Sequence, residues 1–210
     1  MHVCAKNFDM NEKLAKTISI VFHPVVVPTL GMILLLNSGF YFSMLTWEAK
    51  RFILLVVFFT TCILPMLTVS LMALNPRFDI NMPKHTDRIV PQLAASVFYY
   101  LGFVLLGRVT IFPVLKLFML ASVLVIIALL LISFKWKISI HMAALGSLAG
   151  TFFALSFRKG INPVYALLII VLVSGLVGTA RLMLQKHNIW QIIAGYLLGF
   201  LFLYAVVYFV

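Results

Sequence analysis

Charged residues are scarce in this sequence, and acidic residues are the scarcest. Asp, Glu, Lys and Arg make up only 10% of the 210 residues, and five of them are carboxylates. Soluble globular domains carry about 25% charged residues, so this composition excludes an ordinary water-soluble fold. Because 64% of the residues are hydrophobic and the mean hydropathy is +1.15, we expect the bilayer to be the solvent of this chain.

The sequence also has few of the residues from which disulfide frameworks and metal sites are built. Its two cysteines, Cys4 and Cys62, lie far apart and match neither a disulfide pattern nor a metal-ligand spacing. The carboxylates are scattered over the chain, at Asp9, Glu12, Glu48, Asp79 and Asp87. We therefore expect no metal ion and no cofactor.

Basic residues are in excess, with sixteen Lys and Arg and a formal net charge of +11. Basic residues commonly flank transmembrane helices, and this interpretation is stronger than nucleic-acid binding because no basic arm is interleaved with aromatic residues. The partners we expect are membrane lipids with anionic head groups and an anionic lipid substrate. Nothing in the sequence indicates an oligomeric state.

Seven apolar runs approach or exceed the roughly 20 residues that a spanning helix needs. They cover residues 17–37, 51–74, 92–108, 112–134, 139–157, 161–179 and 189–209. The runs are too long for barrel strands. The sequence thus predicts an all-α, polytopic transmembrane bundle of six or seven spanning helices, with a polar N-terminal tail at 1–16 and a single transmembrane domain at 17–210.

Two features inside the runs predict local structure. His23 stands beside Pro24 in the first run, which indicates a kinked helix with a packed or interfacial histidine. Gly195 and Gly199 are four residues apart in the last run, a spacing typical of close helix packing.

If every run spans the membrane, the unusual polar clusters all fall on one face. That face holds the N-terminal tail and the loops at 75–91, 134–138 and 180–188. Three segments stand out on it: Lys84 to Pro91, Lys137 to His141, and Arg181 to Gln191. They bring permanent positive charge and imidazoles to the same side of the bilayer.

The third segment has the parts of a nucleophilic imidazole. In a helical stretch, His187 and Gln191 are at positions i and i+4 and share a face. The Gln191 oxygen could then accept a proton from His187 and leave the other ring nitrogen free. Arg181 offers a planar fork for phosphate oxygens, and His141 would stand opposite as a proton donor. Such groups suit phosphoryl transfer, which needs positioning and stabilisation of negative charge.

These residues resemble the motifs of the type 2 phosphatidic acid phosphatase superfamily, over residues 84–191. The family's third motif, Ser-Arg-x5-His-x3-Asp, is matched by Arg181 and His187, with Ala180 and Gln191 at the flanking positions. Its second, Pro-Ser-Gly-His, is matched by Ser139 and His141. Its first, Lys-x6-Arg-Pro, is represented by residues with a different spacing, namely Lys84, Arg88 and Pro91.

The resemblance implies a metal-independent lipid phosphatase. His187 would be the nucleophile and form a phosphohistidine, and His141 would protonate the leaving alcohol. The phosphate would be held by Lys84, Arg88, Ser139 and Arg181. The substrate would be a phosphate monoester or pyrophosphate of a phospholipid or an isoprenoid.

The departures from the family pattern leave a second function open. Gln191 replaces the family's Asp, and Ile140 replaces the Gly of the second motif. An amide can hold the geometry of a histidine yet lose much of the rate, so a catalytically weak or inactive lipid-phosphate-binding protein is the alternative. A small transporter is a third reading, against which the scarcity of polar residues inside the runs counts.

Orientation is not decided by the basic residues alone. Ten Lys and Arg fall on the site face and six on the other, but the count is seven to six without Lys84, Arg88 and Arg181. The resemblance implies a bacterial inner (plasma) membrane protein with its site on the periplasmic or external face.

Overall fold

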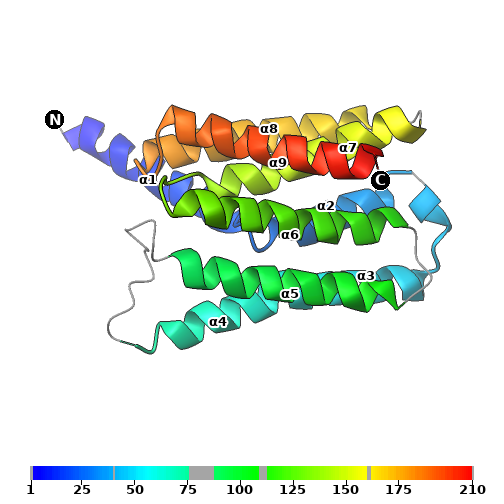
Figure 1. The fold of residues 1–210 in the computed structure, drawn as a ribbon. Coiled ribbons are helices and arrows are strands. Elements are labelled where there is room, and N and C mark those ends of the chain that lie inside the picture. Colours follow the sequence, from blue (N-terminus) through cyan, green and yellow to red (C-terminus); the bar gives the residue numbers. More distant parts are fainter. Residues whose placement is uncertain (1, 40, 76–87, 109–112, 160–161, 210) are drawn as a thin grey trace.

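The protein is a bundle of membrane-length helices. The computed structural model describes residues 2–39, 41–75, 88–108, 113–159 and 162–209, and these ranges contain helices and no β-strand. Six segments are long and apolar enough to cross a membrane, which confirms the predicted all-α, multi-pass class (Figure 1). They are α3 to α4 (Trp47–Met72), α5 (Ile89–Gly107), α6 (Pro113–Ser133), α7 (Ile140–Lys159), α8 (Val164–Met183) and α9 (Ile189–Phe209).

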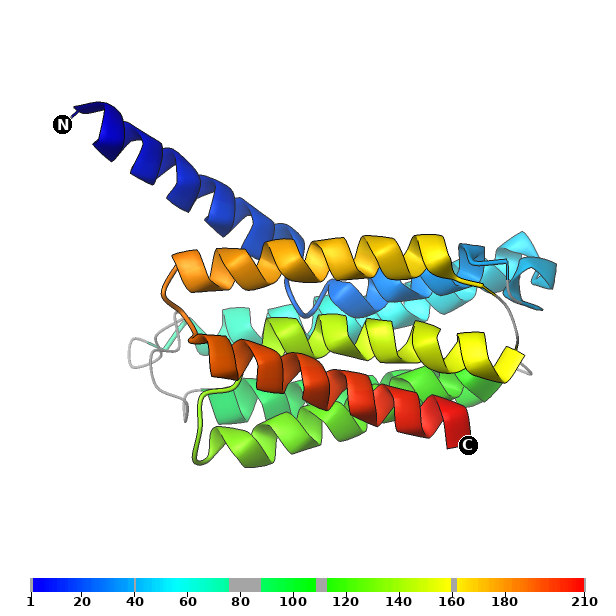
Figure 2. The same ribbon diagram turned by 90° about the horizontal axis from the view of Figure 1, so that it is seen from above.

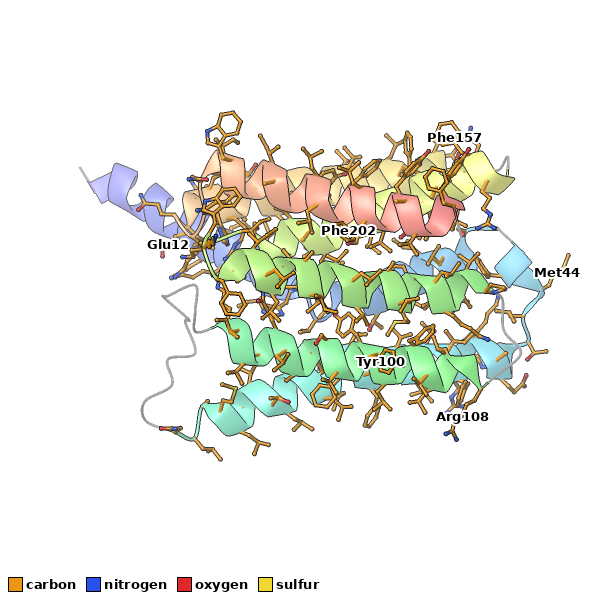
Figure 3. All side chains as sticks on the ribbon, viewed as in Figure 1. Glu12, Met44, Tyr100, Arg108, Phe157 and Phe202 are labelled. Carbon is orange, nitrogen blue, oxygen red and sulfur yellow. The ribbon has the colours of Figure 1, made fainter. Side chains whose placement is uncertain are left out.

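Large apolar side chains cover the outside of this bundle. Tyr100, Phe157 and Phe202 are 52%, 65% and 38% exposed and point outward from α5, α7 and α9 (Figure 3). In five of the six spans less than half of the apolar window is buried, whereas 72% is buried in α7. The outer helices therefore present apolar faces to lipid, and α7 is the central helix.

Small residues let α7 and α9 approach closely. A Cβ added to Gly146 or Gly150 of α7 would collide with the backbone oxygens of Tyr196 and Phe200 on α9. In return, Gly199 of α9 lies against the backbone of α7. The predicted packing role of Gly195 and Gly199 is confirmed, because an added Cβ at either position would collide with a backbone oxygen of the 139–147 segment.

The prediction of a single kinked helix over residues 17–37 was wrong. α1 (His2–Val21) ends there and α2 (Val27–Asn37) begins after a turn at 22–26. Pro24 has no N–H for the helix ladder and disfavours helical geometry at His23. Pro28 falls in the first turn of α2, where its missing N–H costs nothing. The expected boundary of the polar tail, at residue 16, lies inside α1.

A buried threonine compensates the broken ladder. The 22–26 turn leaves carbonyls without helical donors, and the Thr61 hydroxyl donates to the Val25 carbonyl at 3.5 Å. Thr61 belongs to η2 (Phe59–Ile63), a π-helical turn between α3 (Trp47–Phe58) and α4 (Leu64–Met72). Hydroxyls satisfy freed backbone groups of broken membrane helices in this way.

Figure 2 shows α1 leaving the bundle at one end, while α2 runs on toward the other. The polar segments gather at the end from which α1 projects: it carries the starts of α5, α7 and α9 and the end of α8 (Figures 1 and 2). At the opposite end lie the C-terminus, Arg108 and Met44 of η1 (Tyr41–Met44) (Figure 3).

Candidate functional site

A cavity of about 600 Å³ lies at the polar end of the bundle. Its walls come from the end of α1, the 22–26 turn, α4, α5, α6, α7, the last turn of α8 and the turn that follows it. The polar lining residues are His23, Ser70, Arg88, Gln92, His141, Arg181 and His187. Most of the remaining wall is apolar and includes Pro65, Met66, Val69, Ile126 and Leu129. The cavity therefore joins a cationic end to an apolar interior.

Four of the residues predicted from the sequence meet at this cavity. Arg88, His141, Arg181 and His187 all line it, although they come from segments up to about 100 positions apart. Lys84 lies outside the described residues, and its predicted phosphate contact stays a prediction.

The turn between α8 and α9 fixes the spacing of Arg181 and His187. α8 closes with two C-terminal hydrogen bonds, from Lys186 N–H to the Arg181 carbonyl and from Gln185 N–H to the Leu182 carbonyl. This pattern is a Schellman motif, and Gln185 takes the left-handed conformation that it needs, with φ of 51°. Because the motif turns the chain back at once, His187 returns to the end of α8 that carries Arg181.

α9 then begins with a capping box. The Asn188 side chain accepts from Gln191 N–H at 2.9 Å, and the Gln191 side-chain oxygen accepts from Asn188 N–H at 3.2 Å. The same oxygen lies 3.1 Å from Nδ1 of His187. A backbone N–H can only donate, so the atom that it meets on Gln191 is the oxygen. Nδ1 of His187 consequently carries the proton, and Nε2 keeps a free lone pair.

His187 is held in its neutral form. It is 7% exposed, and burial lowers its pKa to about 4, while the hydrogen bond to Gln191 raises it only in part. The positive charges of Arg181, Arg88 and Lys137 lower the pKa further. Nε2 is therefore an unprotonated nitrogen at neutral pH, as a nucleophile requires.

The start of α7 is attached to its neighbours by backbone contacts. Arg88 donates to the Ile138 carbonyl at 3.5 Å, and Ser139 N–H donates to the Gln191 carbonyl at 3.2 Å. Ser139 is fully buried and is not among the residues that line the cavity. The predicted contact between the Ser139 side chain and a phosphate in the cavity is therefore not supported. Gln191 is also absent from the cavity lining and contacts the site only through its hydrogen bond to His187.

Three polar residues that line the cavity were not predicted as site residues, namely His23, Ser70 and Gln92. His23 packs edge-on against His141, with ring centroids 5.4 Å apart and planes at 81°. Gln92 is 7% exposed, and both of its amide atoms are buried without a partner among the described residues. A histidine followed by proline inside an apolar run, and a glutamine one helical turn after Arg88, were the available signals.

Positive charge at the cavity has no described counter-charge. None of the lining residues is Asp or Glu, and the ion pair found in the described part of the chain, Lys16 with Glu12, does not involve the cavity. The Nε of Arg181 is buried without a described partner. Buried cations are costly unless an anion compensates them, so this arrangement suits a bound oxyanion.

The cavity thus combines a free imidazole nitrogen, two guanidinium groups and an apolar chamber. Charge-assisted hydrogen bonds from arginine are well suited to phosphate. Comparison with family models, curated proteins and solved structures gives no match to this chain.

Proposed function

We propose that this protein is a metal-independent lipid phosphatase of the type 2 phosphatidic acid phosphatase kind. It would hydrolyse a phosphate monoester or pyrophosphate of a phospholipid or isoprenoid. The observation that carries the proposal is the meeting of Arg88, Arg181, His141 and His187 at one cavity without a described carboxylate.

In the first step, Nε2 of His187 attacks phosphorus. The P–N bond forms as the P–O bond to the lipid breaks, and His141, doubly protonated while the phosphate dianion is bound, gives the proton on Nδ1 to the departing alkoxide. Arg88 and Arg181 stabilise the charge that spreads over the phosphoryl oxygens. Nδ1–H of His187 keeps donating its hydrogen bond to the Gln191 side-chain oxygen, and this bond holds the ring in the reactive tautomer.

In the second step, water cleaves the phosphohistidine. His141, neutral after the first step, takes a proton from water as the oxygen attacks phosphorus. The P–N bond breaks, inorganic phosphate leaves, and His187 regains its lone pair while His141 regains its proton. The cycle needs no metal ion or cofactor.

The apolar part of the cavity supports a lipid substrate. Arg88, Gln92, Ala95 and Tyr99 form one stripe along α5 that runs from the cationic end into the bundle. At 1.5 Å per residue, the eleven positions from Arg88 to Tyr99 span about 16 Å, roughly half of the hydrocarbon core. A phosphate at the rim would thus leave its alkyl chain against apolar side chains.

A second candidate is a lipid-phosphate binder without turnover. Gln191 favours it, because an amide gives His187 no negative charge with which to stabilise an imidazolium. This candidate predicts that a lipid phosphate raises the unfolding temperature of the purified protein while no inorganic phosphate is released.

Phosphate release from a panel of phosphatidic acid, prenyl phosphate and prenyl diphosphate tests the proposal. Wild-type protein should release phosphate from at least one of them, and both His187→Ala and Arg181→Ala should lose about 10³-fold or more in rate. Arg108→Ala is the matched control, because Arg108 lies at the opposite end of the bundle (Figure 3). A normal rate in His187→Ala would reject the mechanism.

We also propose that the chain belongs to a bacterial inner membrane and that the cavity faces the periplasm or exterior. The motif resemblance supports this orientation, while the basic residues are nearly balanced between the two faces once the predicted site residues are set aside.

A further inference from the structure

His23 is the one imidazole at the cavity that the proposed mechanism does not use. It lies in the turn between α1 and α2 and lines the cavity together with His141, Arg181 and His187. Because Pro24 breaks the helix at this point, the ring is held by a turn of the backbone and not by a regular helix face.

Each ring nitrogen of His23 has a distinct environment. The Val25 backbone N–H donates to Nδ1 at 3.5 Å, so Nδ1 is an acceptor and the proton of the neutral ring is on Nε2. Burial lowers the pKa of His23, and the charge of Arg181 lowers it further, which keeps the ring neutral at physiological pH. Nε2–H is then its single hydrogen-bond donor.

The neighbouring histidine is arranged in a complementary way. Nε2 of His141 lies 3.3 Å from the Ser19 carbonyl of α1, an atom that can only accept, so it carries a proton. Nδ1 of His141 remains for proton transfer. The two rings meet edge to face, and each has one nitrogen engaged with the backbone and one that is not.

We propose that His23 binds the substrate phosphate by donating Nε2–H to a phosphoryl oxygen. This inference rests on the proposed lipid phosphatase function. His23 neither accepts nor gives up a proton, and His141 remains the acid. The broken helix is then a part of the site, because an uninterrupted helix would not hold this ring in the wall of the cavity that His141, Arg181 and His187 also line.

Three substitutions separate phosphate binding from a purely structural role. Glutamine places an amide N–H near the position of Nε2, so His23→Gln should keep activity within about threefold. Asparagine keeps an acceptor for Val25 N–H but cannot reach the phosphate, so His23→Asn should raise KM about tenfold or more, the effect of one hydrogen bond to a charged group. His23→Phe should behave like His23→Asn. Activity retained in His23→Asn and lost in His23→Gln would overturn the proposal.

Leaving-group dependence distinguishes phosphate binding from proton donation. p-Nitrophenyl phosphate needs little protonation of its leaving group, whereas an alkyl phosphate needs much. The loss in His23→Phe should be equal for both substrates. A loss confined to the alkyl phosphate would assign proton donation to His23 and overturn the proposal.

A binding measurement keeps the inference testable if the enzyme proves inactive. Inorganic phosphate should raise the unfolding temperature of wild-type protein and His23→Gln in detergent, with an apparent Kd about tenfold weaker in His23→Asn. That result without turnover in wild-type protein would reject the phosphatase and keep the phosphate contact. Equal Kd values in all variants, or no binding to wild-type protein, would overturn the contact.

Discussion

Gln191 shows how one side chain can serve the backbone and the chemistry together. Its oxygen accepts from Asn188 N–H as part of the cap of α9 and from Nδ1–H of His187. The position therefore needs an acceptor oxygen that both donors can reach.

Gln191→Glu should retain the cap and add the missing charge. A glutamate carboxylate is stabilised at this position, in the first turn of a helix. Its negative charge should raise the pKa of His187 and stabilise the ring as it becomes cationic. We expect phosphohistidine formation, trapped by a rapid alkaline detergent quench, to rise about tenfold or more. An unchanged rate with the fold intact would show that the amide does not limit the reaction.

The lowered pKa of His187 makes the folded state sensitive to acid. The unfolded ring takes up a proton near pH 6.5 and the folded ring only near 4, so stability falls as pH drops through this window, by at most about 3 kcal/mol. Arg181, Arg88 and Lys137 all oppose protonation. Unfolding temperatures in detergent between pH 7.5 and 4.5 should fall less steeply in His187→Asn, whose amide can still donate to Gln191. Equal slopes would contradict this reading.

Sequence patterns predicted part of the site and missed the rest for a physical reason. Arg181 and His187 were predictable because a six-position spacing across a polar break is visible in the sequence. His23 and Gln92 offered only weak signals, a His-Pro pair and a position one helical turn after Arg88, and only the packing of the 22–26 turn against α5 and α7 decides that both face one cavity. Ser139 satisfies the motif pattern but is fully buried outside the cavity lining.

At the scale of elements, the α7–α9 pair holds the site in place. Ser139 and His141 lie at the start of α7, while His187 and Gln191 flank the start of α9. Any separation of these helices would therefore widen the distance between the two histidines. Glycine allows their backbones to touch, so the interface depends on the absence of side chains and not on large apolar ones.

Gly199→Ala should destabilise the protein strongly, because the added methyl would collide with the Ala143 backbone oxygen, which cannot move aside cheaply. We expect a loss of about 2 kcal/mol or more, in the range of overpacked cores, read as a lower unfolding temperature. Gly175→Ala is the control: it lies within α8 and its added methyl meets open space. That variant should be neutral or slightly stabilising, and equal losses in both would contradict the packing argument.

Hydropathy predicted the existence of the spans better than their continuity. The six spanning segments coincide with predicted runs to within a few residues. The prediction failed for the first run because prolines often only kink a membrane helix, so a kink was expected and not a break. The sequence alone does not reveal that the Thr61 hydroxyl supplies a substitute hydrogen-bond donor for the Val25 carbonyl. At this break, the freed Val25 carbonyl is satisfied by a residue that is distant in the sequence.

At the scale of the whole molecule, α1 and α2 together connect the two ends of the bundle. Glu12 lies at the end that carries the cavity and Met44 at the other (Figure 3). α2 is only 11 residues long, so the run predicted at 17–37 connects the two ends through two helices and not through one uninterrupted span. Both ends of this connection can be addressed experimentally.

Single cysteines at residues 12 and 44 should react from opposite sides of the membrane. Glu12→Cys and Met44→Cys, each made with Cys4 and Cys62 replaced by Ala, are at accessible positions, because the Glu12 side chain is 42% exposed and Met44 is 81% exposed. A membrane-impermeant maleimide added to intact cells should label one variant, and labelling of the other should require lysis. Labelling of both without lysis would contradict the arrangement, and an Arg108→Cys variant should follow Met44→Cys.

The two back-to-back caps between α8 and α9 have a consequence for the evolution of this chain. The turn leaves no spare residue: one hydrogen-bond pattern ends at Lys186 and the next starts at Asn188. An insertion or deletion here would rotate His187 away from Arg181, whereas exchanges at the exposed positions between them, other than Gln185 with its positive φ, would leave the geometry intact. Homologues that descend from this sequence should therefore keep the length of the segment while its exposed residues are substituted.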